Sequence, residues 1–414
     1  MNGPGELGLM RRCVSSCSAT ILALCLAVSL LTEVADRSSA MEARIHVGQA
    51  RPFQFGIPNC GRLEFPDAAA RAVRNGDSIL FLFGERSLSY QTIDASGAVH
   101  KTCAVLFASR ERPEYDSFQN AEWVAAVYRY RGKMFGIVHN EFHGHLLSDR
   151  CPTKRYFDCW WNSLTLARSR VKDNGEIEFY SVGRSELIAS AGSPYRPAEA
   201  GLRPTGYFSP TNVFRVGSQY RFAILARLAG DQKPRWCYMF SDAPDHGSAW
   251  KYFGPNREEL PAAEFSADPA RKCTPIAWGR GMETVTGIYQ VQGSPAYVAV
   301  GLGRGRDRSG NVRTGIIAAF SVDLERWTES QLLVAGERFY GVKCDTWNDN
   351  DILAYPAILD LNSADGDFAT VGRNASLIWV RFTGKRCEDQ TVRAAWIAPI
   401  EIQLCLSPVE ECKN

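Results

Sequence analysis

The sequence predicts an all-β protein, and three observations favour that class. Apolar residues recur with a period of two or in short runs, and no stretch keeps a period of 3.6 over the length of a helix. The 414 residues include 35 Gly, 20 Pro, 10 Trp, 15 Tyr and 21 Phe, a composition typical of strands joined by tight turns. Pairs of apolar segments also recur along the chain, separated by Gly, Asn, Asp and Pro.

Five such hairpin patterns are present, and in each the second segment is strongly apolar. They are 70–73 with 78–83, 123–130 with 134–141, 211–216 with 220–227, 284–291 with 296–302, and 355–361 with 376–382. Three of the pairs are followed by a third segment, at 164–167, 239–240 and 316–320, and then by an aromatic segment. The pattern predicts a repeated unit of four antiparallel strands.

Repeats at intervals of roughly 50–90 residues are typical of propeller blades, because radial stacking covers the apolar face that one four-stranded sheet leaves open. Five units fit residues 60–405. We therefore expect a single five-bladed β-propeller domain of four-stranded antiparallel blades over 41–414. An irregular β-sandwich is the alternative.

The N-terminus has the pattern of a secretory signal peptide. Arg11 and Arg12 precede the apolar run 19–31, and the small residues Ser38-Ser39-Ala40 follow it. The run is shorter than the ~20 residues that span a bilayer, so a membrane anchor is the weaker alternative. We expect residues 1–40 to be removed and the mature chain, beginning near Met41, to be secreted or periplasmic.

Cysteine usage and charge agree with an exported protein. Of 13 Cys, Cys13, Cys17 and Cys25 lie in the signal peptide, and an even number remains for disulfides. Neighbours in sequence suggest the pairs Cys151–Cys159, Cys405–Cys412, Cys60–Cys103, Cys237–Cys273 and Cys344–Cys387. The formal net charge of +2 gives no electrostatic footprint for nucleic acid, and we expect a monomer with no membrane partner.

At this point the chain resembles the five-bladed propeller glycosidases. The resemblance rests on the turn Ser321-x-Asp323-Leu324-x-x-Trp327, on Pro66-Asp67 at the start of the first unit, and on the count of five units. The nearest family is glycoside hydrolase family 43 with its relatives, which act on arabinose-, xylose- and galactose-containing glycans. The chain also resembles a secreted group that shares the stretch from His139-Asn140-Glu141 to Cys159-Trp160-Trp161-Asn162.

Polar residues at the starts of the units are the candidates for chemistry, because the innermost strand of each propeller blade begins at the central funnel. These positions carry Asp67, Glu122, Asn212, Glu283 and Tyr355. Glycoside hydrolysis needs two carboxylates, one as acid and one as base, on either side of the scissile bond. Three of the five positions supply a carboxylate.

The resemblance to family 43 implies that Asp67 is the general base. The family then uses a second aspartate and a glutamate as general acid, but here the second position is Glu122 and the third is Asn212. The acid therefore stays open among Glu122, Glu141 and Glu283.

Three of the six histidines lie within seven residues, in His139-Asn140-Glu141-Phe142-His143-Gly144-His145. If this segment is an extended strand, His139, Glu141, His143 and His145 share one face. His143 and His145 are then candidate ligands for calcium or another divalent metal, although no cofactor is required for the expected reaction. A sugar-contacting polar cluster and a structural hydrogen-bond network are the other interpretations.

We expect hydrolysis of a glycosidic bond in an oligo- or polysaccharide. A non-catalytic carbohydrate-binding propeller is the alternative, and a scaffold for another secreted protein is the third hypothesis. Sugars pack their C–H faces on aromatic rings and bind polar side chains through hydroxyls. The candidate substrate-binding residues are Arg71, His139, His143, Asn162, Tyr207, Phe208, Asn212 and Tyr355.

Overall fold

The computed structural model describes residues 42–53, 67–83, 88–93, 99–146, 151, 159–190, 204–228, 231, 233–264, 272–338, 352–382 and 393–405. The predicted signal peptide lies outside them. The chain divides into two units, Ile45–Ile402 and a second unit of Met1–Arg44 with Gln403–Asn414. In the second unit the described residues, 42–44 and 403–405, are ends of strands. The fold below is that of Ile45–Ile402.

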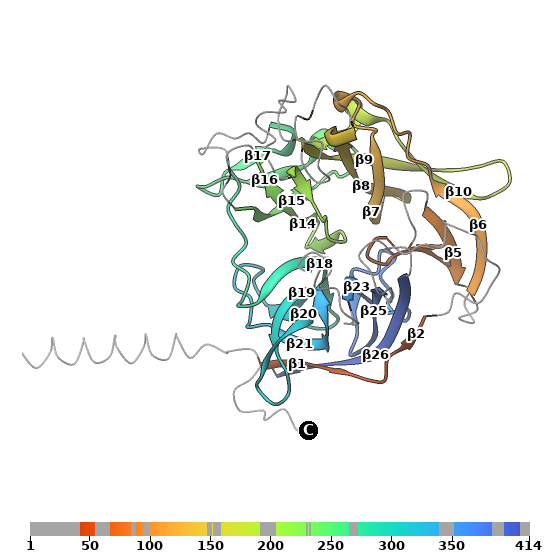
Figure 1. Ribbon diagram of the computed structural model, residues 1–414. Helices are drawn as coiled ribbons and strands as arrows, with labels where there is room; N and C mark the ends of the chain where they lie inside the picture. Colours follow the sequence, from red (N-terminus) through yellow and green to blue (C-terminus); the bar gives the residue numbers. More distant parts are fainter. Residues whose placement is uncertain are drawn as a thin grey trace, which may run out of the picture. The chain divides into compact units, whose positions relative to one another are not determined.

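The described residues form strands and short 3₁₀ turns, so the predicted all-β class is confirmed (Figure 1). The strands form three hydrogen-bonded sheets, of 15, 5 and 6 strands. The 15-stranded sheet consists of three groups of strands, joined by the parallel pairs β10–β6 and β12–β9, and these groups are called the first, second and third sheets below. The first sheet holds β3 (Arg71–Asn75), β4 (Ser78–Leu82), β5 (Leu88–Ile93) and β6 (Val99–Phe107). The second holds β7 (Ala121–Tyr130), β8 (Lys133–His143), β9 (Trp160–Val171), β10 (Ile177–Ser181) and β11 (Leu187–Ala189). The third holds β12 (Thr205–Phe208), β13 (Phe214–Val216), β14 (Gln219–Arg227), β15 (Arg235–Ser241), β16 (Lys251–Phe253) and β17 (Glu259–Pro261).

Two further sheets complete the arrangement. The fourth holds β18 (Met282–Val291), β19 (Tyr297–Arg306), β20 (Val312–Ser321), β21 (Gln331–Ala335) and β24 (Thr370–Val371). The fifth holds β22 (Glu337–Arg338), β23 (Ile352–Leu359), β25 (Asn374–Phe382), β26 (Arg393–Cys405), β1 (Glu42–Val47) and β2 (Arg51–Pro52). All five predicted hairpins are present as antiparallel pairs. The sequence did not predict that β1 would join the last sheet, beyond β26.

Neighbouring sheets pack apolar face to apolar face. Four hydrophobic clusters lie between the first and second, the second and third, the third and fourth, and the fifth and first sheets. The strands that begin the sheets also contact one another: β3 with β7, β13 with β18, β18 with β23, and β23 with β3. Fully buried examples from the four clusters are Val73 with Val138, Leu164 with Ile224, Phe214 with Ile288, and Phe81 with Ile378. Burial of these faces is the main stabilising contribution to such an assembly.

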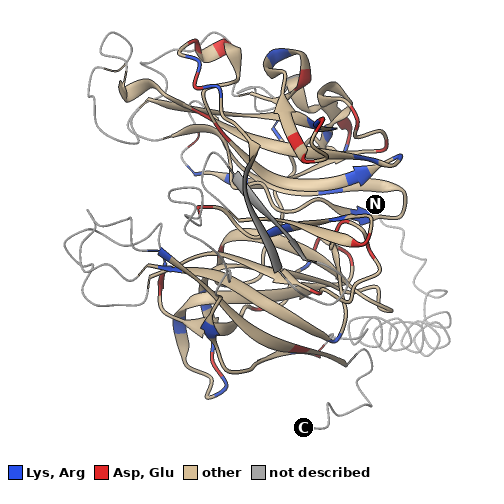
Figure 2. Ribbon diagram, turned by 90° about the vertical axis from the view of Figure 1, so that its right-hand side faces the viewer, with Lys and Arg blue, Asp and Glu red and all other residues tan. Residues whose placement is uncertain are grey.

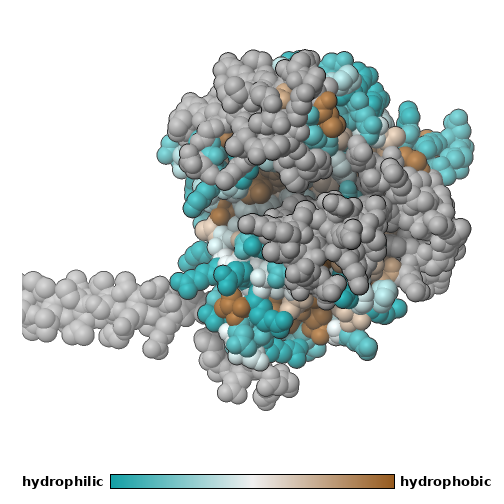
Figure 3. Space-filling view, in the orientation of Figure 1, coloured by the Kyte–Doolittle hydropathy of each residue, from teal (hydrophilic) through white to brown (hydrophobic). Residues whose placement is uncertain are grey.

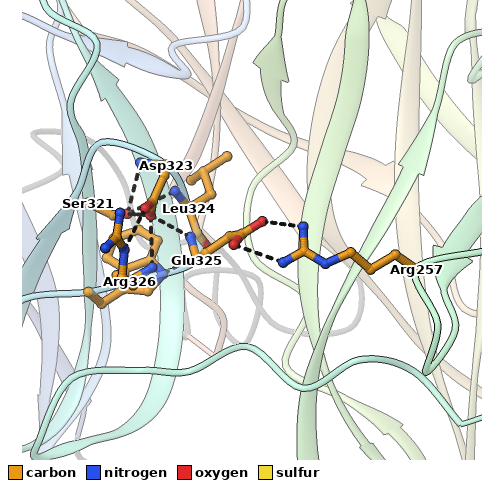
Figure 4. Close-up of polar contacts among 7 residues, drawn as sticks. Arg257, Ser321, Asp323, Leu324, Glu325 and Arg326 are labelled. Atoms are coloured by element: carbon orange, nitrogen blue, oxygen red, sulfur yellow. Dashed lines mark hydrogen bonds and ion pairs between the residues drawn. The ribbon is translucent and has the colours of Figure 1, made fainter. Parts of the chain in front are cut away.

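The turn that begins at Ser321, on which much of the family resemblance rests, is stabilised by its own hydrogen bonds (Figure 4). Ser321 Oγ accepts the backbone N–H of Leu324 at 2.8 Å, and Asp323 Oδ1 accepts those of Glu325 and Arg326 at 2.9 and 2.8 Å. These hydrogen bonds oppose the effect of partial burial on Asp323 and lower the pKa of its carboxyl to about 2. Glu325 pairs with Arg257 at 2.9 Å, across the third and fourth sheets. The motif therefore stabilises a turn and contributes no candidate catalytic group.

Two of the five expected disulfides lie among residues whose side chains are described, and both are confirmed: Cys151–Cys159 and Cys237–Cys273. Each of the other three expected pairs includes cysteines outside that set. Across the parts of the chain with a described structure, no helix is long and apolar enough to cross a membrane.

The described surface mixes charges and shows only small apolar groups. In Figure 2, Lys and Arg are interspersed with Asp and Glu along the strands. The face shown in Figure 3 is mostly hydrophilic where it is described, with hydrophobic residues in separate small groups. The large hydrophobic residues exposed in the described segments are Leu146, Val171, Val182, Val312, Val322 and Leu361. Isolated apolar residues of this kind are ordinary for a surface.

The segment 360–372 links several sheets. The backbone N–H of Arg74, on β3, donates to the carbonyl oxygen of Gly366 at 2.7 Å. The backbone N–H of Arg129, on β7, donates to Asp367 Oδ1 at 2.7 Å. β24, which lies within the segment, pairs in parallel with β18. A weakened segment 360–372 would therefore loosen the first, second and fourth sheets together.

We predict that Asp367→Asn flattens the pH dependence of stability. Burial, with the nearby charge of Asp365, raises the pKa of Asp367 from 3.8 to about 7. Between these two pKa values the folded state binds more protons than the unfolded state. The free energy of unfolding therefore falls as the pH rises from about 4 to about 7, by up to about 1.4 kcal/mol per pH unit. Urea unfolding at pH 5 and pH 8 measures this difference. Asp307→Asn, at an exposed turn, is the matched control and should keep the wild-type difference. An unchanged difference in Asp367→Asn would contradict the assignment.

Candidate active site

Strand β8 carries His139, Glu141 and His143 on one face of the second sheet, because side chains alternate along a strand. The expectation of a shared face is confirmed for these three residues. β8 ends at His143, and Gly144–Leu146 forms a 3₁₀ turn, so His145 does not continue the strand.

Glu141 lies between two imidazoles. His143 Nε2 is 2.8 Å from Glu141 Oε2, and His139 Nδ1 is 3.8 Å from Glu141 Oε1. The three side chains are 13–17% exposed, so they are mostly buried but still reach solvent. The cluster can therefore bind a ligand and exchange protons.

Residues of β9 hold the imidazoles in place. The Asn162 amide nitrogen is 3.0 Å from His139 Nε2, in the second sheet where Asn162 pairs with Glu141. The Trp160 ring lies 4.1 Å from the His143 ring, and Trp160 Nε1 donates to His145 Nδ1 at 2.9 Å. His145 is thus linked to the cluster by its hydrogen bond with Trp160.

Burial lowers the pKa of His139, and the charge of Glu141 opposes that shift. Burial thus favours the neutral form of His139. The Asn162 amide and the backbone of Tyr207 are the hydrogen-bonding partners of its ring.

Strand β12 brings Phe208 to this cluster and turns Tyr207 away from it. β12 pairs with β9 where Gly206 faces Asn162. Gly206 has φ +114°, and a Cβ there would lie 2.0 Å from the carbonyl oxygen of Asn162, so only glycine permits the approach. The Phe208 ring lies edge-on to His139 at 6.3 Å, whereas Tyr207 is fully buried in the core.

Asp67 lies immediately before the first sheet. Its Oδ1 accepts hydrogen bonds from Arg393 Nη1 and from Tyr355 Oη, the latter at 3.3 Å. Tyr355 has φ 51° and lies in a bulge of β23, where pairing with β25 shifts between Ala354 and Ala357. The bulge takes Tyr355 out of the strand ladder and leaves its hydroxyl at Asp67.

The charge of Glu141 acts on Asp67. Burial raises the pKa of Asp67, Arg393 and Tyr355 oppose that rise, and the negative charge of Glu141 adds a further rise that is the smallest of these effects. The side chains of Asp67 and Glu141 are 20% and 16% exposed. Both carboxylates are therefore partly accessible, and they come from different sheets.

Glu122 lies on the opposite face of the second sheet. It pairs with Asn140, whereas Glu141 pairs with Ala121. Its side chain is fully buried, Oε2 accepts the backbone N–H of Arg110 at 3.2 Å, and burial raises its pKa to about 7. The structure does not bring Glu122 to Asp67.

Three other predicted residues have partners outside the cluster. Glu283 forms an ion pair with Arg338 and is 44% exposed. Asn212 makes two hydrogen bonds to the backbone of Ile288, at 2.7 and 2.8 Å. Arg71 is buried and donates to backbone carbonyls. Direct roles for these residues in catalysis or sugar binding remain predictions.

Arg393 is the site residue that the sequence analysis missed. Its guanidinium lies 4.8 Å from the centre of the Phe382 ring, and its side chain is 7% exposed. It stands 326 residues from Asp67 in sequence. An arginine at the start of an apolar strand is the one local signal, and it is weak.

The metal hypothesis gains no third ligand among the described residues, where no group of three His, Cys, Asp or Glu side chains could hold an ion. His143 and His145 have ring centroids 5.7 Å apart, and each already has a polar partner. Their role as metal ligands stays a prediction.

No protein-family model matches the chain, and no curated protein matches it significantly. Solved structures do match. The α-L-arabinanase of Cellvibrio cellulosa complexed with arabinohexaose is 10% identical, with a TM-score of 0.44 over 80% of this chain and 91% of that chain. The endo-1,5-α-L-arabinanase of Thermotoga petrophila RKU-1 complexed with TRIS is 10% identical, with a TM-score of 0.44 over 84% and 75%.

A thermostable family-43 glycoside hydrolase is 8% identical, with a TM-score of 0.41 over 85% of this chain and 96% of that chain. The resemblance to family-43 glycosidases stated from the sequence thus has its counterpart among solved structures. At this low identity, function has to be derived from the side chains of the chain itself.

We predict that Glu141→Gln lowers the pKa of His139 further. The carboxylate charge raises that pKa, so its removal leaves burial less opposed. Titration of the imidazole C–H signals by NMR measures the change, with His139→Gln to assign the signal. Glu283→Gln, at the exposed ion pair, is the control and should leave the His139 titration unchanged. A rise in the His139 pKa in Glu141→Gln would contradict the proposed arrangement of charges.

Proposed function

We propose that the chain hydrolyses glycosidic bonds with Asp67 and Glu141 as its two carboxylates. The observation that carries the proposal is that two partly exposed carboxylates come from different sheets and that the charge of Glu141 acts on Asp67, where it adds to the rise in pKa caused by burial. Glu122 is sealed from solvent, and Glu283 is paired with Arg338. Of the three candidate acids, Glu141 is the one whose charge acts on Asp67, which supports its assignment.

In this mechanism Asp67 is the general base and Glu141 the general acid. Glu141 gives its proton to the leaving glycosidic oxygen as the C–O bond breaks. Asp67 takes a proton from the water whose oxygen forms the new bond to the anomeric carbon, from the opposite side of the sugar. Burial raises the pKa of Asp67, and the hydrogen bonds from Arg393 and Tyr355 oppose that rise and favour the ionised form that the base requires.

The neighbouring groups suit a sugar. Asn162 and the imidazoles of His139 and His143 offer hydrogen-bonding groups, and Phe208 offers an aromatic edge beside His139. A substrate hydroxyl would replace one of the contacts that Glu141 makes with an imidazole. We therefore take an oligo- or polysaccharide as the substrate class and assign substrate contacts to His139, His143, Asn162 and Phe208.

Carbohydrate binding without hydrolysis is the second candidate function. It is favoured by Asn212, which occupies a position where an acid might stand and whose amide is hydrogen-bonded to the backbone of Ile288. In that case Asp67 and Glu141 would bind sugar hydroxyls and no bond would break.

We further infer that the five sheets are the blades of a five-bladed propeller and that the mature chain is an exported monomer. Contacts between the strands that begin successive sheets, including β23 with β3, support the first inference. Two disulfides support export, because disulfides persist in oxidising compartments. N-terminal sequencing of the exported protein tests cleavage near Met41.

We predict that Asp67→Asn and Glu141→Gln each reduce hydrolysis of a responsive oligosaccharide by about 100-fold or more. Glu283→Gln, which also removes a glutamate charge, should keep wild-type kcat. The measurement is the release of new reducing ends from a diverse oligosaccharide library, followed by mass spectrometry. NMR of the first product should show inversion at the anomeric carbon.

Three outcomes contradict parts of the proposal. Equal activity in Asp67→Asn and wild type removes Asp67 as the base. Loss of activity in Glu283→Gln moves the acid to the fourth sheet. Binding of a glycan by wild type and variants, with no new reducing ends, supports the second candidate function.

A further inference from the structure

We propose that Arg71 is an internal cation that joins three sheets through backbone carbonyls and thereby positions Asp67. The link to Asp67 as a catalytic group rests on the proposed function, whereas the cation site does not. Arg71 is 6% exposed and lies at the start of β3, four residues after Asp67.

The guanidinium donates to carbonyl oxygens of three different strands or strand leaders. Nη1 donates to Ala70 at 3.1 Å, Nε donates to Ala125 of β7 at 2.7 Å, and Nη2 donates to Thr286 of β18 at 2.7 Å. The first, second and fourth sheets therefore meet at one side chain.

The carbonyl oxygens of Ala125 in β7 and Thr286 in β18 are available to Arg71 because each of these residues lies in a β-bulge. Pairing of β7 with β8 shifts between Val124 and Ala126, which leaves Ala125 outside the ladder. Pairing of β18 with β19 shifts between Val285 and Gly287, which leaves Thr286 outside it. A bulge frees a backbone group from the ladder, and a buried carbonyl then needs a donor.

A guanidinium suits this position better than a neutral donor. Several inward-pointing carbonyl dipoles stabilise positive charge, and the planar fork reaches three acceptors at once. Among the described residues, no carboxylate is paired with Arg71. The phenol of buried Tyr289 feels its charge, since Arg71 opposes the burial that raises the Tyr289 pKa.

The same contacts fix the segment that leads into β3. Arg71 bonds to Ala70, its own neighbour, and to two other sheets, so residues 67–71 cannot shift along β7 or β18 without breaking these bonds. Asp67 is then held between Arg393 and Tyr355. Arg71 is thus a positioning residue that touches no reacting atom.

Chemical rescue tests the cation site. Arg71→Ala should lower Tm by about 5 °C or more, and added guanidinium at about 1–50 mM should restore part of that loss by occupying the vacated position. Val73→Ala, a core truncation on the same strand, is the matched control: its Tm should not rise with guanidinium. Arg71→Gln takes the place of Arg71→Ala if the alanine variant does not fold.

Hydrogen exchange and kinetics test the positioning role. Exchange of the amides of 67–75 should rise in Arg71→Ala and fall again with guanidinium. If the wild type hydrolyses a glycan, kcat should drop in Arg71→Ala with little change in KM, and guanidinium should restore kcat over the range in which it restores Tm.

Absence of rescue in Tm and in exchange, or a wild-type Tm in Arg71→Met, would overturn the proposal. A wild type that cleaves no glycan would contradict the proposed function alone, because Tm and exchange do not depend on turnover.

Discussion

Hydrogen bonds between the strands that begin the sheets are the constraint on which the arrangement depends. Apolar packing draws neighbouring sheets together but does not fix their height or angle, because it has no direction. Thr286 of the fourth sheet donates its hydroxyl to the carbonyl of Pro356 in the fifth, and Asn212 of the third sheet bonds to Ile288 of the fourth. These directional bonds fix neighbouring strands relative to one another, and Pro356, which accepts one of them, directly follows Tyr355, whose hydroxyl donates to Asp67.

Local pattern was enough to predict the strands. The five hairpins alternate apolar and polar residues or form short apolar runs, and their turns contain Gly or Asn, so each is encoded within 28 residues or fewer. The sequence could not assign β1 to the fifth sheet, because its partner β26 lies some 350 residues away. The role of Arg393 could not be predicted for the same reason, because its contact with Asp67 is a tertiary contact that no local sequence pattern indicates.

The sequence predicted which types of residue the site contains, but only some of the individual residues. The cluster of His139, Glu141 and His143 could be recognised because alternate residues on one strand necessarily share a face. The sequence could not show which glutamates are accessible to solvent and which are buried. Glu122 and Glu141 have the same chemistry, and burial on one face or partial exposure on the other decides which of them can meet a substrate.

One β-bulge, at Ala125 in β7, places Glu122 and Glu141 on opposite faces of the second sheet. From Tyr130–Lys133 to Ala126–Ile137, β7 and β8 keep one register, and continued without interruption it would pair Glu122 with Glu141 on the same face. The extra residue, Ala125, shifts the register by one, so Glu122 faces Asn140 and points away from Glu141. The carbonyl of this residue is also the one that accepts Arg71 Nε. The irregularity that separates the two carboxylates is therefore also one of the points at which the first and second sheets are joined. A regular hairpin would place two like charges side by side and leave Arg71 without that acceptor.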